Sequence, residues 1–169
     1  MTRILATAVA ALLVAAPVVP SVAQTAAPIT NTDHQFLVKD AQGSAYEVAI
    51  AALAQQRSSR GDVKAYASRL LTDHAAYNQA LQELANAKGV TLPTTMTADD
   101  QVRLNSMNSQ AGSTADASFI EEATRINAED KQDAAEEAAK TADPDIKAFL
   151  RKFEPVDAEH ERLALALRR

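Results

Sequence analysis

Three ionisable side chains interrupt apolar helical stripes. Glu47 precedes Ile50 by three residues in SAYEVAIAAL, His74 follows Leu70 by four residues, and His160 lies in VDAEHERL. A carboxylate or imidazole in a protein core needs a partner, because its removal from water is costly. Imidazole and carboxylate ligands suit Zn, Fe or Cu, so the three residues are candidate metal ligands. Alternatively, they form a hydrogen-bonded polar cluster that fixes the register of the helices.

The elements that must position these residues are helices. The 169-residue chain has four Gly, six Pro and few aromatic residues, and it is rich in alanine, which favours a single all-α domain. Apolar residues at spacings of four and three predict long helices over about 33–56, 62–88, 116–140 and 143–167. Thr97 and Asp100 have the spacing of a capping box and predict a short helix to about residue 108.

The lengths of the connections predict how the helices are arranged. Short turns follow the first and third long helices, so each of these two pairs should form an antiparallel hairpin. The long connection after the second helix can cross the bundle and contains the short extra helix. The prediction is an antiparallel four-helix bundle of ferritin-like topology. Counting from the turns places Glu47, His74 and His160 near mid-height, with Asn127 or Ile126 opposite them on the third long helix.

The N-terminus has the pattern of an export signal. Arg3 precedes an apolar run of about 13 residues, which is short for a membrane-spanning helix, and small residues follow it at Ser21 and Ala23. We therefore expect a signal peptide at 1–23, a flexible leader at 24–32 and one domain at 33–169. Localisation is expected to be periplasmic, with outer-membrane association or release as alternatives, and no transmembrane span in the mature chain.

Other features exclude several functions. The chain has no cysteine, so disulfides and thiolate ligands are absent. With a net charge of −5 and no basic cluster, a nucleic-acid partner is not expected. No nucleophile elbow or phosphate loop is present, so we do not expect an enzyme. The acidic run EDKQDAAEEAAK is interpreted as the solvated face of its helix. Asp157, three residues before His160, completes only half of a di-iron pattern, and Asp73 is interpreted as a surface carboxylate or as an orienter of a ring.

The segments FLVKDAQGSAYEVAIAALA, VKAYASRLLTDHAAYNQAL, GVTLP and DPDIKAFLRKFEPVDAEHERLA resemble, in order and spacing, the exported bacterial family called domain of unknown function 4142 (DUF4142). That family is regarded as ferritin-like. The resemblance matches Glu47, His74 and His160 to positions where the family has Glu, His and His. It matches Asn127 to a position where relatives typically have a further His.

Two functions follow as expectations. The first is an exported, non-enzymatic helical protein with an envelope or stress-related interaction role, in which Glu47, His74, Asn127 and His160 form a buried polar cluster. The second is a ferritin-like protein that binds a single divalent transition metal (Zn, Fe or Cu). Its ligands would be Glu47, His74 and His160, with assistance from Asn127 or Asp157. No protein partner can be identified from the sequence.

Overall fold

The computed structural model describes residues 29–169, and this range is entirely helical and loop. Its helices are α1 (Asn31–Arg57), α2 (Gly61–Lys88), α3 (Ala98–Asn108), α4 (Gly112–Lys140) and α5 (Pro144–Ala166). The expected all-α fold class is confirmed for this range. The predicted signal peptide and the first part of the predicted leader lie outside the described residues.

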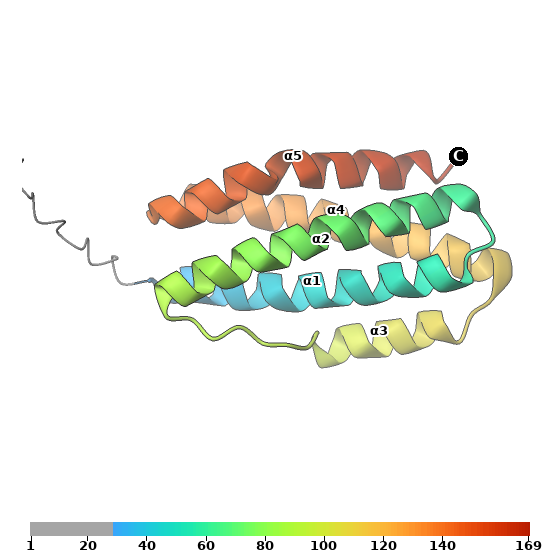
Figure 1. The fold of residues 1–169 in the computed structure, drawn as a ribbon, viewed down its shortest axis with the longest axis horizontal. Coiled ribbons are helices and arrows are strands. Elements are labelled where there is room, and N and C mark those ends of the chain that lie inside the picture. The colour runs from blue at the N-terminus through green and yellow to red at the C-terminus, as the bar shows by residue number, and fades with distance from the viewer. Residues whose placement is uncertain (1–28) are drawn as a thin grey trace, which may run out of the picture.

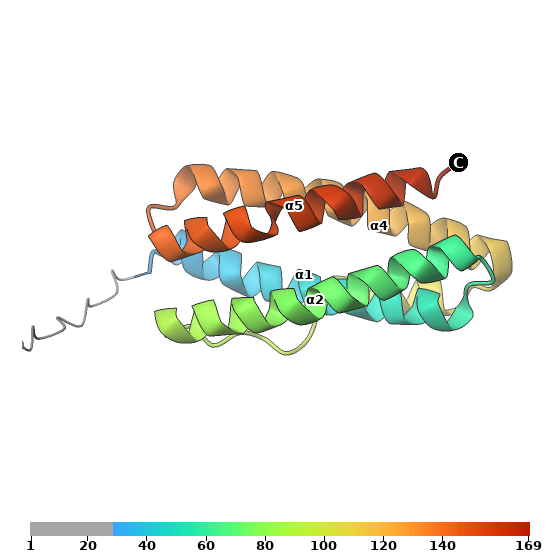
Figure 2. The same ribbon diagram turned by 45° about the horizontal axis from the view of Figure 1, so that its top comes forward.

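The four long helices lie alongside one another, as Figures 1 and 2 show. Helix α1 packs most extensively on α2, and α4 packs most extensively on α5. Three-residue turns, 58–60 and 141–143, join the helices of each pair. The short helix α3 lies in the long connection between α2 and α4, as predicted, and packs against α1 and α4. The described chain is therefore a helical bundle with one small helix on its outside.

The helix ends agree with the sequence signals at several points. Gly89 ends α2 with φ of 69°, a left-handed conformation that glycine adopts without strain. The side chain of Asp143 accepts hydrogen bonds from the backbone N–H groups at the start of α5, and Pro144 is its first residue. Lys88 donates to Asp143 at 2.6 Å, so the end of α2 is attached to the start of α5.

Two predicted helix starts were wrong. The N-cap of α1 is Thr30, because its hydroxyl accepts from the backbone N–H of Asp33 while the Asp33 carboxylate accepts from the backbone N–H of Thr30. Helix α4 begins four residues before the predicted Asp116, at Gly112. No side chain caps this end, so the sequence carried no capping signal there. The φ of 60° at Gly112 allows the sharp turn that leads from α3 into α4.

Two apolar clusters make up the core, one on each side of mid-height. The first contains residues such as Ile50, Leu70, Phe119 and Ala164, and the second contains residues such as Leu37, Leu81, Ile146 and Phe153. On every long helix the polar residues of the middle lie between members of these two clusters. Buried apolar surface above and below therefore holds the four helices in register at the height where the polar side chains meet.

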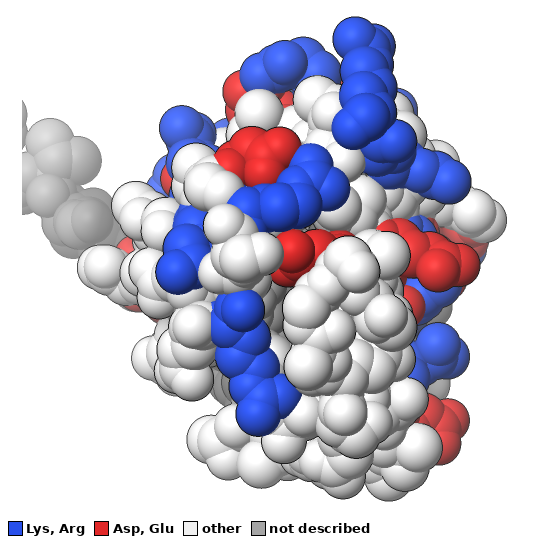
Figure 3. Space-filling view, turned by 90° about the vertical axis from the view of Figure 1, so that its right-hand side faces the viewer, with Lys and Arg blue, Asp and Glu red and all other residues white. Residues whose placement is uncertain are grey.

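The surface shows charges of both signs. On the end that carries the C-terminus, Lys and Arg side chains alternate with Asp and Glu and with uncharged residues (Figure 3). Arg60 on this end pairs with Asp62 and donates to the backbone carbonyl of Leu167, which connects the start of α2 to the C-terminus. Among the described helices, none has an apolar stretch sufficient to cross a membrane.

Candidate functional site

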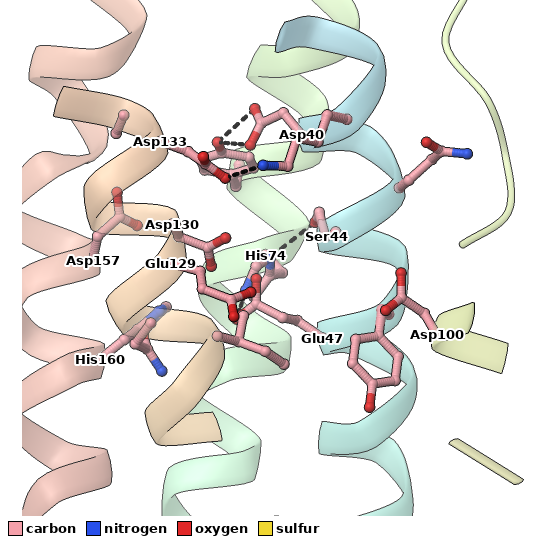
Figure 4. Close-up of a pocket in the computed structure, with 18 of the residues that line it drawn as sticks. Asp40, Ser44, Glu47, His74, Asp100, Glu129, Asp130, Asp133, Asp157 and His160 are labelled. Atoms are coloured by element: carbon pink, nitrogen blue, oxygen red, sulfur yellow. Dashed lines mark hydrogen bonds and ion pairs between the residues drawn. The ribbon is translucent and has the colours of Figure 1, made fainter. Parts of the chain in front are cut away.

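A cavity of about 300 Å³ lies at mid-height between the long helices. Its ionisable lining comes from all four of them (Figure 4): Asp40 and Glu47 from α1, His74 from α2, Asp130 from α4, and Asp157 and His160 from α5. Asn127 also lines it. Glu47, His74 and His160, predicted from different helices, therefore face the same space, and the predicted fourth residue borders it.

Glu47 and His74 form the centre of the site. Both are more than nine-tenths buried, and His74 Nε2 lies 3.3 Å from Glu47 Oε2. Ser44 donates its hydroxyl hydrogen to Asn78 Oδ1 at 2.6 Å, so it accepts from Nδ1–H of His74, at 2.9 Å. This hydrogen bond places the proton of the neutral ring on Nδ1. The lone pair of Nε2 then faces the Glu47 carboxylate.

Nε2 of His74 is buried and has no hydrogen-bond partner. Burial lowers the pKa of His74, but the neighbouring Glu47 carboxylate more than offsets this, and the net shift of the pKa is upward. A bare lone pair beside a carboxylate is repulsive. A cation shared by the two groups, either a proton or a metal ion, converts that repulsion into attraction.

His160 is held by a different carboxylate. Its Nε2 donates to Asp73 Oδ2 at 2.9 Å, and Arg69 donates to the same oxygen. Burial lowers the pKa of His160, so its neutral form is favoured. Its ring stacks on that of His74, with ring centres 5.9 Å apart. Of the two roles that the sequence allowed for Asp73, the structure supports the orienter, and the ring it orients belongs to α5 rather than to its neighbour His74.

Asn127 is buried, but its amide nitrogen does not join the other three residues. It donates to the hydroxyl of Tyr66 at 3.0 Å and to the backbone carbonyl of Ala123 at 2.6 Å. The sequence placed Asn127 at the correct height. Its contacts show a role in fixing α4 against Tyr66 of α2.

Three further carboxyl groups face the cavity, and burial together with the charge of Glu47 raises the pKa of each. Burial raises the pKa of Asp40 to about 7, although a hydrogen bond from Tyr77 acts in the opposite direction. Burial and the charges of neighbouring carboxylates raise the pKa of Asp130 well above its ordinary value. Burial and the charge of Glu47 raise the pKa of Asp157 to about 6. Lys39, Arg103 and Arg125 also line the cavity, but the ion pairs described for Lys39 and Arg125 are with Asp133, Glu122 and Glu129 rather than with these carboxyl groups or Glu47.

Helical spacing could have identified these additional carboxyl groups. Asp40 precedes Glu47 by seven residues, which is two helical turns, and Asp130 follows Asn127 by three. The interpretation of EDKQDAAEEAAK as a solvated face was wrong for two of its residues. Asp130 faces the cavity, and Glu137 is buried beside Asp33 at the far end of the bundle. It was correct for the Glu136–Lys140 pair, which is exposed and joined at 2.9 Å.

The cavity side chains do not surround a common point as they stand. Within residues 29–169, no three His, Asp or Glu side chains are arranged as a metal-ion site. Glu47 and His74 are close enough to share a cation, and a side-chain hydrogen bond with Glu47 is among the causes that raise the pKa of Asp130. What the geometry provides is one buried imidazole–carboxylate pair within a group of acidic side chains.

Comparison with known proteins identifies one family. A family model described as "Domain of unknown function (DUF4142)" matches residues 19–167, which is nearly the whole chain. No curated protein and no solved structure matches the chain.

Proposed function

The chain belongs to the DUF4142 family, whose description assigns no activity, and we propose that it is a non-enzymatic metal-binding protein. In this proposal the bundle has the ferritin-like four-helix topology and holds one divalent transition metal, Zn, Fe or Cu, in the mid-height cavity. Glu47 and His74 are the principal ligands. His160, Asp130 and Asp157 supply the remaining donors, and Asn127 borders the site.

The contacts of the two ring nitrogens of His74 are the observation that carries the proposal. Metal-bound histidines commonly donate their second ring N–H to a fixed acceptor, which orients the ring and sets its tautomer. Ser44 provides this acceptor for Nδ1, and Nε2 remains without a partner 3.3 Å from Glu47. A nitrogen lone pair and a carboxylate oxygen that face each other are two ligands of the kinds that bind zinc, iron and copper.

The group of acidic side chains supports the same conclusion. Four carboxyl groups around about 300 Å³ repel one another when ionised, and the raised pKa values of Asp40 and Asp130 reflect burial and this repulsion. A divalent cation would neutralise two of these charges and compensate for the cost of burying them.

A second function is favoured by a separate observation. Ser44, His74 and Asn78 form a hydrogen-bonded chain between α1 and α2, and Asp73 and His160 form another between α2 and α5. Such chains fix helix register without any metal. In this alternative the bundle is a scaffold for an envelope or stress-related interaction, and the cavity groups are neutralised by protons.

We further propose that the protein is exported to the periplasm, on the basis of the N-terminal sequence. Expression in a Gram-negative host with periplasmic extraction should yield a chain that begins at Gln24 when its mass is measured. A chain that retains residues 1–23 in the cytoplasmic fraction would contradict export. It would leave the metal proposal unaffected, because the proposed ligands all lie between Glu47 and His160.

The metal proposal is tested on this periplasmic protein. Elemental analysis is expected to find about one equivalent of Zn, Fe or Cu, and the chelator-treated protein should bind one equivalent of Zn²⁺ in isothermal titration calorimetry. A Glu47→Gln variant should lose this binding, while Glu136→Gln, which changes an exposed carboxylate, should retain it. A metal-free wild type that also binds no added Zn²⁺, Fe²⁺ or Cu²⁺ would leave only the scaffold function.

A further inference from the structure

The cavity reaches the surface between α1 and α4. This is the more loosely packed side of the bundle, since α1 contacts α4 less extensively than it contacts α2. The outer lining at this mouth comes from α1, α3 and α4, and includes the acidic residues Asp99, Glu129 and Asp133 and the basic residues Lys39, Arg103 and Arg125. Lys39 and Asp133 are both solvent-accessible, whereas the Glu47–His74 pair is buried.

Carboxylates lead inward from this mouth along α4. Asp133 follows Asp130 by three residues, so the two side chains lie one above the other on the same face of the helix. Figure 4 shows Asp133 beside Asp40 at one end of the pocket, with Asp130 nearer to Glu47 and His74. An entering cation would therefore meet Asp133 first and Asp130 next.

The ammonium group of Lys39 is already paired with Asp133, the outermost of these carboxylates. Lys39 of α1 forms an ion pair with Asp133 of α4, so this contact spans the mouth. Lys39 is 71% exposed, and an exposed ion pair of this kind is weak, which allows it to open on its own. A divalent cation could displace the lysine because it carries twice the charge on a single centre.

We propose that the Lys39–Asp133 ion pair is the gate of the cavity, where Lys39 occupies the first cation-binding carboxylate until a divalent metal ion displaces it. This inference rests on the proposed metal site and adds the route and control of entry. Lys39 is tethered next to Asp40, so it remains close to the mouth after displacement and can close it again.

Substitutions of the two partners of the gate are expected to change the association rate of Zn²⁺ in opposite directions. Lys39→Gln leaves Asp133 free to attract the incoming ion, and the association rate of Zn²⁺ should rise about 3-fold to 10-fold at low salt. Asp133→Asn removes the first carboxylate and leaves the Lys39 ammonium unpaired at the mouth, so association should slow by a similar factor. A purely structural ion pair would respond in the same direction to the loss of either partner.

Stopped-flow mixing of the metal-free protein with Zn²⁺, followed with a competing zinc-responsive dye, measures these rates. Lys64→Gln, the same charge change on the exposed face of α2, controls for long-range electrostatics and should leave the rate within about twofold. If Lys39→Gln and Lys64→Gln each bind one equivalent of zinc at equal rates, the gate is contradicted and the metal site is not. Faster or slower entry in both Lys39→Gln and Asp133→Asn would also overturn it. Absence of zinc binding in the wild type would overturn both the gate and the site.

Discussion

Replacement of His74 by alanine is expected to weaken the binding of Zn²⁺ at least about 100-fold, because it removes the nitrogen donor whose geometry is best defined in the cavity. The expected loss is measured by competition with a chelator of known affinity. His34→Ala is the matched control. His34 is exposed at the start of α1 and is not among the residues that line the cavity, so its replacement should leave the affinity unchanged.

A second variant separates metal binding from folding, since alanine at a buried histidine also leaves a void. Ser44→Ala retains the His74 ring but removes the acceptor for Nδ1–H. Loss of such an orienting contact typically weakens metal binding about 10-fold to 100-fold. Wild-type affinity in a folded His74→Ala protein would show that zinc binds elsewhere.

The metal-free protein is expected to lose at least about 3 kcal/mol of stability between pH 5 and pH 8, since one of the groups below would alone account for that amount. The pKa values of Asp40, Asp157 and Glu137 are raised to about 7, 6 and 7, and that of Asp130 is also raised, in each case with burial as the largest cause. The native state therefore holds protons that the unfolded chain releases above about pH 4. One such proton held across two pH units corresponds to about 2.7 kcal/mol.

The histidines act on this slope in opposite directions. The pKa of His74 is raised, so its contribution also falls as the pH rises, whereas the lowered pKa of His160 gives a contribution that grows as the pH rises above the acid range. Five groups act in one direction and His160 alone in the other. Between pH 5 and pH 8, stability should therefore decline as the pH rises. At lower pH stability should fall as well, because acid protonates the carboxylates whose pKa values are lowered, such as Asp73.

Urea unfolding at pH 5, 6, 7 and 8 in the presence of a chelator measures this dependence. Asp130→Asn should raise the stability at pH 8 and flatten the slope, because it removes one of the crowded charges. Glu121→Gln, on the exposed surface of the same helix, should not. Saturating Zn²⁺ should restore the stability of the wild type at pH 8. A chelator-treated protein that is more stable at pH 8 than at pH 5 would contradict the account of the acidic side chains.

The sequence predicted the elements and the centre of the site because both depend on helical spacing. The stripe through Leu70, His74 and Leu81 fixes the face of α2 that enters the core, and the short turns fix the height at which Glu47 and His160 meet it. Asp130 was missed because it lies within a strongly acidic run. Spacing in a single helix cannot show which of several neighbouring carboxylates has the cavity opposite it.

The sequence offered Asp73 as a possible orienter of a ring, but it could not predict the partners in the hydrogen bonds of the site. The pairing of Asp73 with His160 joins residues 87 positions apart, and it depends on the rotation of α5 relative to α2. Asn127 had the correct height, but its amide is directed to Tyr66 by the packing of α4. The tautomer of His74 follows from Ser44 and Asn78, neither of which has a residue type that marks it as functional.

Anomalous diffraction from crystals grown with stoichiometric Zn²⁺ tests the central claim most directly, because it locates the metal. The account predicts one strong peak in the mid-height cavity, about 2.0–2.2 Å from His74 Nε2 and from a carboxylate oxygen of Glu47, with Asp130 or Asp157 turned inward. Peaks confined to surface residues such as His34, with Nε2 of His74 still without a ligand, would contradict it.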